Sequence, residues 1–533
     1  MGIPLFFKII SDKYDNIIHQ TIDNSNNNSI FFDLNCLIHP CAQRIVKNYY
    51  HKNKDILENK IYNEVILYTK KIISLVNPSF VYIAIDGVAP FAKMNQQRQR
   101  RFKSVLEKQQ IKEIKSDLNL EPDNEWDSNA ISPGTEFMNK LIEKINTFIQ
   151  NDDIFKQKEV IFSSSNICGE GEHKILQYIK DNEIKDNIII YGLDADLIML
   201  SMICVKSNIY LLREQIINGK PVDDNYIYVN IDNLKINLLK DFEERYYDKH
   251  NNYTFQYNYN IIHDYIFICF FLGNDFIPHI LSLDLRYQGL DIIMDIYIYI
   301  HKLTNEHFVQ DGKINMYFLK LFLQKLSEKE DEVTTLVFKK RINYNKYFKI
   351  KADNDYDKRI ELLNNKPIIE MEKEFLITKE KFHVTHWKYN YYKHCFDIDT
   401  KNEIDEICKN YIEGIFWTFE YYFNKCSSWR WKYQYNYAPT LSDLYKYICK
   451  NPDYIKIKHE TPVKPIVQLL FILPKKSKSI LPIKYQKYMT DFDLGLTHLY
   501  PESYELSCLF KRYYWQCTPI LPCIDNTLIQ LIK

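Results

Sequence analysis

Two aspartates, Asp194 and Asp196, interrupt an apolar run at residues 191–200, "YGLDADLIML". Ionised carboxylates are rarely buried unless a partner charge or a metal ion compensates them. The run by itself leaves two interpretations, a turn or helix cap at the end of a strand, or a metal site. The other carboxylates of the chain bear on this choice.

Five further carboxylates lie in or at the end of apolar segments, which gives a set of seven: Asp33, Asp86, Glu170, Glu172, Asp194, Asp196 and Asp275. Brought together, they would repel one another strongly. Hard divalent cations prefer oxygen ligands and remove that repulsion. For any single member a cap or turn is the simpler explanation. The whole set predicts a site for two Mg²⁺, with Mn²⁺ as a substitute, of the kind that hydrolyses phosphodiesters.

A basic segment follows Asp86. In "FAKMNQQRQRRFKS" (91–104), one helical face carries Lys93, Gln97, Arg100 and Arg101, while Arg98 points elsewhere. Cations and an amide beside a metal site suit a terminal phosphate, which arginine holds with two hydrogen bonds. A solvated basic face is the alternative for the helix alone, and its position after Asp86 favours a phosphate pocket.

Strands that alternate with helices must position these side chains. The runs "IFFDLNCLIHP" (30–40), "FVYIAIDGVAP" (80–90), "KEVIFSSS" and "NIIIYGLDADL" are β-rich and apolar, and helical patterns lie at about 55–77 and 172–182. This alternation predicts an α/β fold with a mainly parallel sheet. Ligands of such sheets bind beyond the carboxyl ends of the strands, so we expect the seven carboxylates at buried strand ends.

The overall charge is balanced, with 69 Lys and Arg against 69 Asp and Glu. Without the seven carboxylates, 62 acidic residues remain against 69 basic ones, a net charge of +7 that is consistent with a phosphate backbone as ligand. No apolar run approaches the ~20 residues that span a bilayer, and Lys8 and Asp12 come too early for a secretory signal. We expect an intracellular monomer without membrane contact, cytoplasmic rather than nuclear.

These stretches resemble the XRN family of 5′→3′ exoribonucleases. The resemblance rests on "MGIPLFFKIIS", "FFDLNCLIHPCA", "YIAIDGVAPFAKMNQQRQRRFKS", "SNAISPGTEFM", "IFSSSNICGEGEHKI", "YGLDADLIMLS", "FFLGNDFIPHI", "YIEGIFWTFEYYF…SSWRWKYQYNYAP", "LPIKYQKYMTD" and "YPESYEL". It covers most of the chain except about 305–385. It implies a PIN/flap-nuclease-like α/β core at 1–300, a variable helical connector at 301–385, and a mostly helical, aromatic-rich second conserved region at 386–533. That second region would wrap the core and narrow the active-site entrance.

The resemblance also implies an activity, the Mg²⁺-dependent, processive removal of nucleotides from single-stranded RNA with a 5′ monophosphate. The seven carboxylates would bind the metals, and the basic face at 93–101 would hold the 5′ phosphate. His39 and a tryptophan, Trp429 in preference to Trp431, would stack on terminal bases, a mode of binding that tolerates any sequence. A packed histidine before Pro40 and tryptophans in the core are the alternatives.

We expect the chain to depart from the family's cytoplasmic branch, because the sequence does not continue into the long C-terminal extension of that branch. Its short length and its AT-rich codon bias, inferred from abundant Tyr, Phe, Ile, Asn and Lys, suggest a large DNA virus or a protist as source. Two other functions stay open. A structure-specific flap endonuclease on DNA would share the carboxylates without needing the aromatic second region. A non-catalytic RNA-binding scaffold would be favoured by loss of a carboxylate, and none is lost.

Overall fold

The computed structural model describes residues 6–22, 27–217, 220–247, 258–366, 384–398, 400–453 and 455–524. Residues 1–5, which belong to the first stretch of the resemblance, and residues 367–383 of the expected connector lie outside this part of the chain. The central sheet has seven strands in the order β1-β7-β6-β5-β2-β3-β4. The parallel strands are β2 (Asn28–Asp33), β3 (Phe80–Ala84), β4 (Glu159–Ser163), β5 (Asn187–Tyr191) and β6 (Ile209–Ile217). β7 (Lys220–Asn230) and β1 (Ile18–His19) extend one edge antiparallel. The prediction of a mainly parallel sheet is confirmed.

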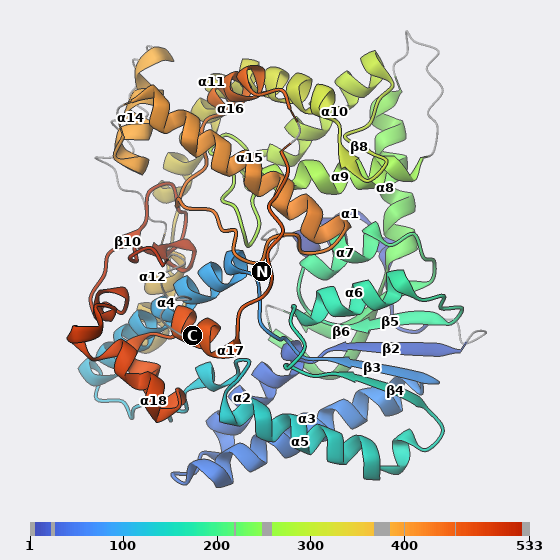
Figure 1. The fold of residues 1–533 in the computed structure, drawn as a ribbon, viewed down its shortest axis with the longest axis vertical. Helices are drawn as coiled ribbons and strands as arrows, with labels where there is room; N and C mark the ends of the chain where they lie inside the picture. Colours follow the sequence, from blue (N-terminus) through green and yellow to red (C-terminus); the bar gives the residue numbers. More distant parts are fainter. Residues whose placement is uncertain are drawn as a thin grey trace.

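Helices cover both faces of the sheet (Figure 1). One face packs against α2 (Asn35–Tyr49), α3 (Lys54–Val76) and α5 (Glu136–Asn151), and the other against α6 (Gly171–Asp181) and α7 (Asp196–Ile203). Side chains of β2 alternate between the two cores, with Ile30 and Phe32 in the first and Phe31 in the second. Burial on both faces explains why these strands appear in the sequence as continuous apolar runs.

The strand order reverses direction beside β2. The chain runs from β2 through β3 to β4 on one side and then returns to β5 and β6 on the other side of β2. The connections after β2 and β5 therefore leave in opposite directions. In open parallel sheets this switch point, beyond the carboxyl ends of the strands, is where ligands bind.

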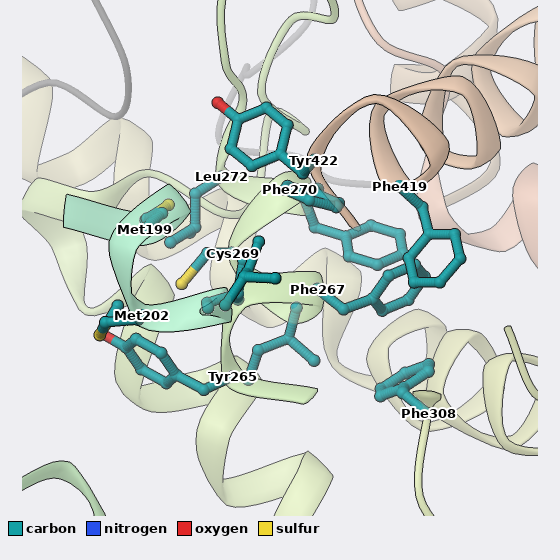
Figure 2. Close-up of a cluster of buried hydrophobic side chains, with 14 of the residues drawn as sticks. Met199, Met202, Tyr265, Phe267, Cys269, Phe270, Leu272, Phe308, Phe419 and Tyr422 are labelled. Atoms are coloured by element: carbon teal, nitrogen blue, oxygen red, sulfur yellow. The ribbon is translucent and has the colours of Figure 1, made fainter. Parts of the chain in front are cut away.

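A helical layer lies beyond α7 (Figure 1). It comprises α8 (Ile231–Tyr246), α9 (Tyr259–Cys269), α10 (Gly289–Thr304), α11 (Met316–Lys346), α15 (Lys401–Phe423) and α16 (Leu441–Lys450), with α14 (Val384–Phe396) at its margin. The cluster in Figure 2 joins this layer to α7, because Met202 of α7 lies beside Tyr265 of α9 and the same cluster includes Phe419 and Tyr422 of α15. Phe267 lies 6.0 Å from Phe419, centroid to centroid. This shared core fixes α15 and the segment after α9 relative to α7.

The basic segment forms α4 (Phe91–Asp117), and the C-terminal part of the chain lies against it (Figure 1). That part contains α17 (Pro465–Ile472), α18 (Ile483–Gln486) and the hairpin of β10 (Leu506–Ser507) and β11 (Thr518–Pro519). The Phe91 and Phe471 rings are 5.0 Å apart. Arg98 is buried and donates to the carbonyl oxygens of Leu499 and Pro522, so it anchors the second region and faces away from the predicted basic face. The expected wrapping of a mostly helical region around the core is confirmed.

The remaining elements are short or peripheral. α1 (Phe6–Lys13) precedes the sheet, α12 (Asp355–Asn365) reaches α4 through an ion pair between Arg359 and Asp117, and β8 (Val309–Gln310) pairs with β9 (Lys313–Ile314). Among the described residues, none of the helices combines the length and the apolar character that crossing a bilayer requires.

Two expectations from the sequence are wrong in detail. After Asp33 the chain enters α2 almost at once, so residues 35–40 are helical and Pro40 lies within that helix. Asp275 does not follow a strand, because "YIFICFFLG" folds as the end of α9 and a 3₁₀ turn at residues 270–272. A run that is apolar on every side has no periodicity, so the pattern alone does not distinguish a buried helix from a buried strand.

Candidate active site

Three adjacent strands bring four of the predicted carboxylates together. Asp33 is the last residue of β2, Asp86 lies two residues after β3, and Asp194 lies between β5 and α7, which begins at Asp196. Because β3, β2 and β5 are neighbours and parallel, their carboxyl ends lie side by side at the same edge of the sheet.

Contrary to the expectation from the sequence, the other three carboxylates do not lie at strand ends but next to helices. Glu170 immediately precedes α6 and Glu172 lies in its first turn. Asp275 reaches the cluster from the helical layer, after the 3₁₀ turn at residues 270–272. The position of Asp275 therefore depends on the core of Figure 2, whose labelled members include Phe270 and Leu272 of that turn.

Hydrogen bonds fix the carboxylates of Asp33 and Asp86. Asn35 Nδ2 donates to Asp86 Oδ2 over 2.9 Å, and the Gly171 N–H donates to Asp86 Oδ1 over 2.6 Å. Cys36 Sγ donates to Asp33 Oδ2 over 3.1 Å. The helices that follow the strands thus hold carboxylates of neighbouring strand ends.

The seven carboxylates form one electrostatic cluster. Ligand-type atoms lie within 4.8 Å of one another in two groups, Asp33–Cys36–Asp194 and Glu170–Glu172–His173. The charges of the seven also act on one another across these groups, as Asp86 and Asp194 do on Asp33, Glu170 on Asp86, Asp275 on Asp196, and Asp196 on Glu172. The structure brings all seven together, and their role as metal ligands stays a prediction.

Burial makes this cluster hold protons near neutral pH. Burial and then neighbouring negative charges raise the pKa of Asp33 to about 8, of Asp196 to about 7 and of Asp86 to about 6. The same causes raise the pKa of Glu172 well above its ordinary range. Asp275 is the exception, since burial alone would raise its pKa but the Lys93 ammonium lowers it below the usual value. A cation entering the cluster would displace these protons.

Two carboxylate oxygens give an independent sign that the cluster fits a metal. Asp33 Oδ1 and Glu172 Oε2 are buried, and within the described part of the chain neither has a hydrogen-bond partner. Buried polar atoms in folded proteins are nearly always satisfied by a donor, a water molecule or an ion. Carboxylate oxygens suit hard cations such as Mg²⁺ or Mn²⁺. The acidic clusters can therefore hold metal.

Lys93 lies among the carboxylates. Its ammonium is 2.5 Å from Glu170 Oε2 and 2.9 Å from Asp275 Oδ2, and its side chain is 12 % exposed. Burial would lower the pKa of Lys93, but Asp275 and Glu170 outweigh that effect and raise it above its ordinary value. Lys93 thus bridges the acidic cluster and the basic face of α4.

The other residues of the predicted basic face make fewer contacts with protein groups than Lys93 does. Arg101 Nη2 donates to Ser132 Oγ over 2.7 Å, whereas its buried Nη1 has no hydrogen-bond partner among the described residues. Burial lowers the pKa of Arg101 to about 10. Gln97 accepts a long hydrogen bond, 3.4 Å, from Gln468 Nε2. Arg101 keeps an unused donor, which an anion could accept.

His39 lies near these arginines. It retains solvent-exposed surface, yet the surrounding protein atoms and then the charges of Arg101 and Arg100 lower its pKa to about 4. The imidazole is therefore neutral at pH 7. A neutral ring beside two cations can stack on a base without repelling those cations.

The two candidate tryptophans differ in how they pack. Trp431 is half-buried, but it stacks on Trp417 with 5.3 Å between the ring centroids, contacts the position of Gly414 and so packs against the core. Trp429 is also half-buried, and its carbonyl oxygen accepts from the N–H of Phe91, the first residue of α4. This backbone bond places Trp429 at the start of the basic helix.

Comparison with known families agrees with the geometry. Residues 1–215 match the family described as "XRN 5'-3' exonuclease N-terminus", and residues 255–375 and 370–531 match the "Xrn1 helical domain". The chain belongs to the XRN family. The match to the helical domain also runs through residues 305–385, which the resemblance read from the sequence had left out.

Curated members of the XRN family are similar over almost the whole chain. The 5'-3' exoribonuclease 1 of Homo sapiens is 30% identical, and the alignment covers 99% of this chain and 34% of the human protein. The 5'-3' exoribonuclease 1 of Schizosaccharomyces pombe is 27% identical, with 99% of this chain and 48% of the yeast protein covered. The 5'-3' exoribonuclease 2 homolog of Drosophila melanogaster is 27% identical, with 99% and 70% covered. The chain thus spans about a third to a half of the first two relatives.

Sequence reasoning missed several residues that support this XRN-type cluster. Cys36 and His173 stand in the two ligand-type groups, and the Tyr421 hydroxyl of α15 donates to Glu170 Oε1 over 2.7 Å. The His173 and Tyr421 rings are 3.8 Å apart. Cys36 and His173 adjoin predicted carboxylates in the sequence and could have been singled out for that reason. Tyr421 is one of many aromatic residues in its segment, and only the fold identifies it.

Proposed function

We propose that the chain is a 5′→3′ exoribonuclease that hydrolyses single-stranded RNA with a 5′ monophosphate, processively, to 5′-mononucleotides. The observation that carries this proposal is the buried seven-carboxylate cluster with the basic face of α4 beside it. The similarity of nearly the whole chain to proteins named 5′-3′ exoribonucleases supports the same activity. Neither the flap endonuclease nor the scaffold has such support.

We assign the two groups of ligand-type atoms to two Mg²⁺ ions, with Mn²⁺ as a substitute. Two such ions would stabilise the charge that develops on the attacking and leaving oxygens of a phosphodiester. Asp33 and Asp194 belong to one group and Glu170 and Glu172 to the other, with Asp86, Asp196 and Asp275 completing the set. Lys93 holds Glu170 and Asp275 close together by pairing with both.

The basic face of α4 would receive the 5′ phosphate. The free Nη1 donor of Arg101, together with Arg100 and Gln97, offers hydrogen bonds and positive charge to a phosphate. A 5′ monophosphate brings the oxygens that these donors require, whereas a 5′ hydroxyl leaves Arg101 buried and unsatisfied. Caps and triphosphates would be excluded by their size and charge.

The first bases of the RNA would stack on His39 and Trp429. Stacking on flat rings is independent of sequence, as processive degradation requires. Trp429 is preferred to Trp431, because Trp431 is already stacked on Trp417. The second conserved region (386–533) carries Trp429, and its C-terminal part lies against α4. We infer that this region narrows the entrance of the active site to a width that admits one RNA strand.

The test is an Mg²⁺-dependent digest of one single-stranded RNA, labelled at either end, that carries a 5′ monophosphate, hydroxyl or triphosphate. Asp194→Asn removes one charge of the cluster at constant volume. Asp181→Asn, at the exposed end of α6, is the matched control. We expect mononucleotides from the monophosphate RNA with the wild type and the control, and none with Asp194→Asn.

The other outcomes are distinct. Internal cuts that do not depend on the 5′ end, or cleavage of flapped DNA instead of RNA, would favour the endonuclease. RNA binding without cleavage would favour the scaffold. Full activity of Asp194→Asn would refute the metal assignment while leaving the activity in place.

A further inference from the structure

A separate cavity of about 290 Å³ lies beside the candidate active site. We call it the α4 cavity, because it opens on the face of α4 formed by Asn95, Gln96, Gln99 and Lys103. Residues 272–279, 510–512 and 515–519 line most of the rest, together with Asp284, Tyr433, Tyr435 and Asn436. The cavity borders on the active site at Arg100 and Asp275, but the Gln97 and Arg101 side of α4 does not line it. Its volume is at the lower end of the range for small-molecule sites.

The charge of this cavity favours an anion. Lys511 lines it, and the Lys511 ammonium lies 6.0 Å from the centroid of the Tyr437 ring. Within the described residues no carboxylate forms an ion pair with it. Burial lowers the pKa of Lys511, and the positive charges of Arg341 and Lys103 lower it further, against an opposing effect of the Cys517 and Cys395 thiols. Lys511 is half-buried, and a charge partly withdrawn from water without a counterion is costly. An anionic ligand would remove that cost.

The two carboxylates of the cavity wall have other partners. Asp275 pairs with Lys93 on the active-site side. Asp284 accepts a hydrogen bond from the Arg286 N–H and interacts with His279. Neither is an ion-pair partner of Lys511, so the positive charge of the cavity stays available.

The remaining lining is suited to a heteroaromatic ring. Tyr433, Tyr435 and Trp515 contribute flat apolar faces. Trp515 lies parallel to Tyr513, with 6.0 Å between ring centroids, and is 40 % exposed. Side-chain amides at 95, 96, 99 and 516 offer donors and acceptors around these rings. A simple inorganic anion would use the cation and leave the rings and amides without a role.

We propose that the α4 cavity binds a nucleoside 5′-monophosphate, with its phosphate at Lys511 and its base against Tyr435 and Trp515. The assignment rests on the proposed function, since such a nucleotide is the product of that reaction. The cavity borders on the cluster at Asp275 and lies on a different face of α4 from Arg101. A released nucleotide can therefore occupy it while the next 5′ phosphate is bound at Arg101.

Calorimetric titration of the full chain with adenosine 5′-monophosphate, in EDTA, tests the proposal. We expect two equivalents bound by the wild type, one of them weakened about tenfold in Lys511→Gln and the other in Arg101→Gln. Trp515→Ala, at a partly exposed ring, should weaken the Lys511 equivalent for the nucleotide and leave titration with inorganic phosphate unchanged. Lys339→Gln, at an exposed lysine of α11, is the matched control.

The binding readout and the RNA digest separate the two proposals. One equivalent that is lost in Arg101→Gln and kept in Lys511→Gln overturns the cavity assignment. So does binding of inorganic phosphate as tight as that of the nucleotide at the Lys511 site. Two equivalents in a chain that fails to digest RNA would overturn the proposed function and leave the cavity as a nucleotide site. Lys511→Gln should digest monophosphate RNA at the wild-type initial rate.

Discussion

Gly171→Ala probes the carboxylate cluster without removing a charge. Gly171 is the first residue of α6, and a Cβ built on it would lie 2.8 Å from Asp33 Oδ1 and 3.4 Å from Asp86 Oδ1. Ordinary contacts of a Cβ begin at 3.4 Å. The Asp33 carboxylate must therefore retreat by about 0.6 Å, the difference between these distances, while Cys36 and the end of β2 hold it in place.

A shift of this size should affect activity more than stability. Displacement of a reacting group by 1 Å costs about 100-fold in rate, so we expect Gly171→Ala to lose about 10- to 100-fold in the single-turnover rate on 5′-monophosphate RNA. Replacing glycine by alanine in a helix gains at most about 1 kcal/mol. That gain offsets part of the strain, and the free energy of unfolding should stay within about 1 kcal/mol of the wild type.

Gly312→Ala is the matched control, with the opposite pattern. Gly312 lies in the β8–β9 turn at φ +70°, and nothing lies within 4 Å of its Cβ position. A left-handed backbone costs an alanine about 1–2 kcal/mol, so this variant should lose stability and keep the wild-type rate per folded molecule. Denaturant unfolding and single-turnover cleavage, measured on both variants, separate the two effects.

One result would refute the reasoning about Asp33. If Gly171→Ala cleaves at the wild-type rate and its melting temperature responds to Mg²⁺ with the same midpoint concentration, the position of Asp33 does not matter for metal or catalysis. The cluster would then need a different assignment of ligands.

Three further predictions follow from the buried groups. Because the pKa values of Asp33 and Asp196 are raised in the folded state, the metal-free protein should lose stability as pH rises from about 4 to 8. The increase in melting temperature on adding Mg²⁺ should therefore be larger at pH 8 than at pH 6. Equal increases at the two pH values would contradict the metal assignment. Arg101→Gln should reduce the rate ratio between 5′-monophosphate and 5′-hydroxyl RNA about tenfold, and an unchanged ratio would place the phosphate site elsewhere. Asp264 is fully buried and accepts hydrogen bonds from the Tyr297 hydroxyl, the Val309 N–H and the His307 ring. Asp264→Ala should therefore lower the free energy of unfolding, measured with denaturant, by about 3 kcal/mol or more. A loss below about 1 kcal/mol would show that these donors find other partners.

The local sequence pattern predicted strands β2 to β5 of the central sheet and the basic helix α4. The strands that end near Asp33 and Asp86 are continuous apolar, β-rich runs followed by turn residues, and the helix with Lys93 and Arg101 on one face follows from its spacing. Parallel strands place their carboxyl ends on the same edge of the sheet, so the sequence was enough to infer that Asp33, Asp86 and Asp194 lie close together. The helical start of α2 was missed because its first residues form a short apolar run that fits either structure.

Contacts between distant segments could not be inferred in this way. Asp275 enters the cluster because α9 and α15 share a core with α7, and no local pattern encodes that packing. The same holds for Tyr421, whose hydroxyl reaches Glu170 from 251 residues away. The choice between Trp429 and Trp431 also depends on a tertiary contact, the stacking of Trp431 on Trp417 of α15.

The sequence by itself determined which groups are available for chemistry. These are seven carboxylates in apolar segments, a basic helical face after Asp86, and parallel strands that bring Asp33, Asp86 and Asp194 to one edge of the sheet. Residue type and periodicity suffice for that, because they are local properties of the chain. Only the tertiary structure decided that Lys93 pairs with the carboxylates, that Arg98 anchors the C-terminal region, and that Lys511 stands without a counterion in a cavity beside the site. These outcomes depend on which distant segments exclude water together, and burial of that kind is a property of the packed fold.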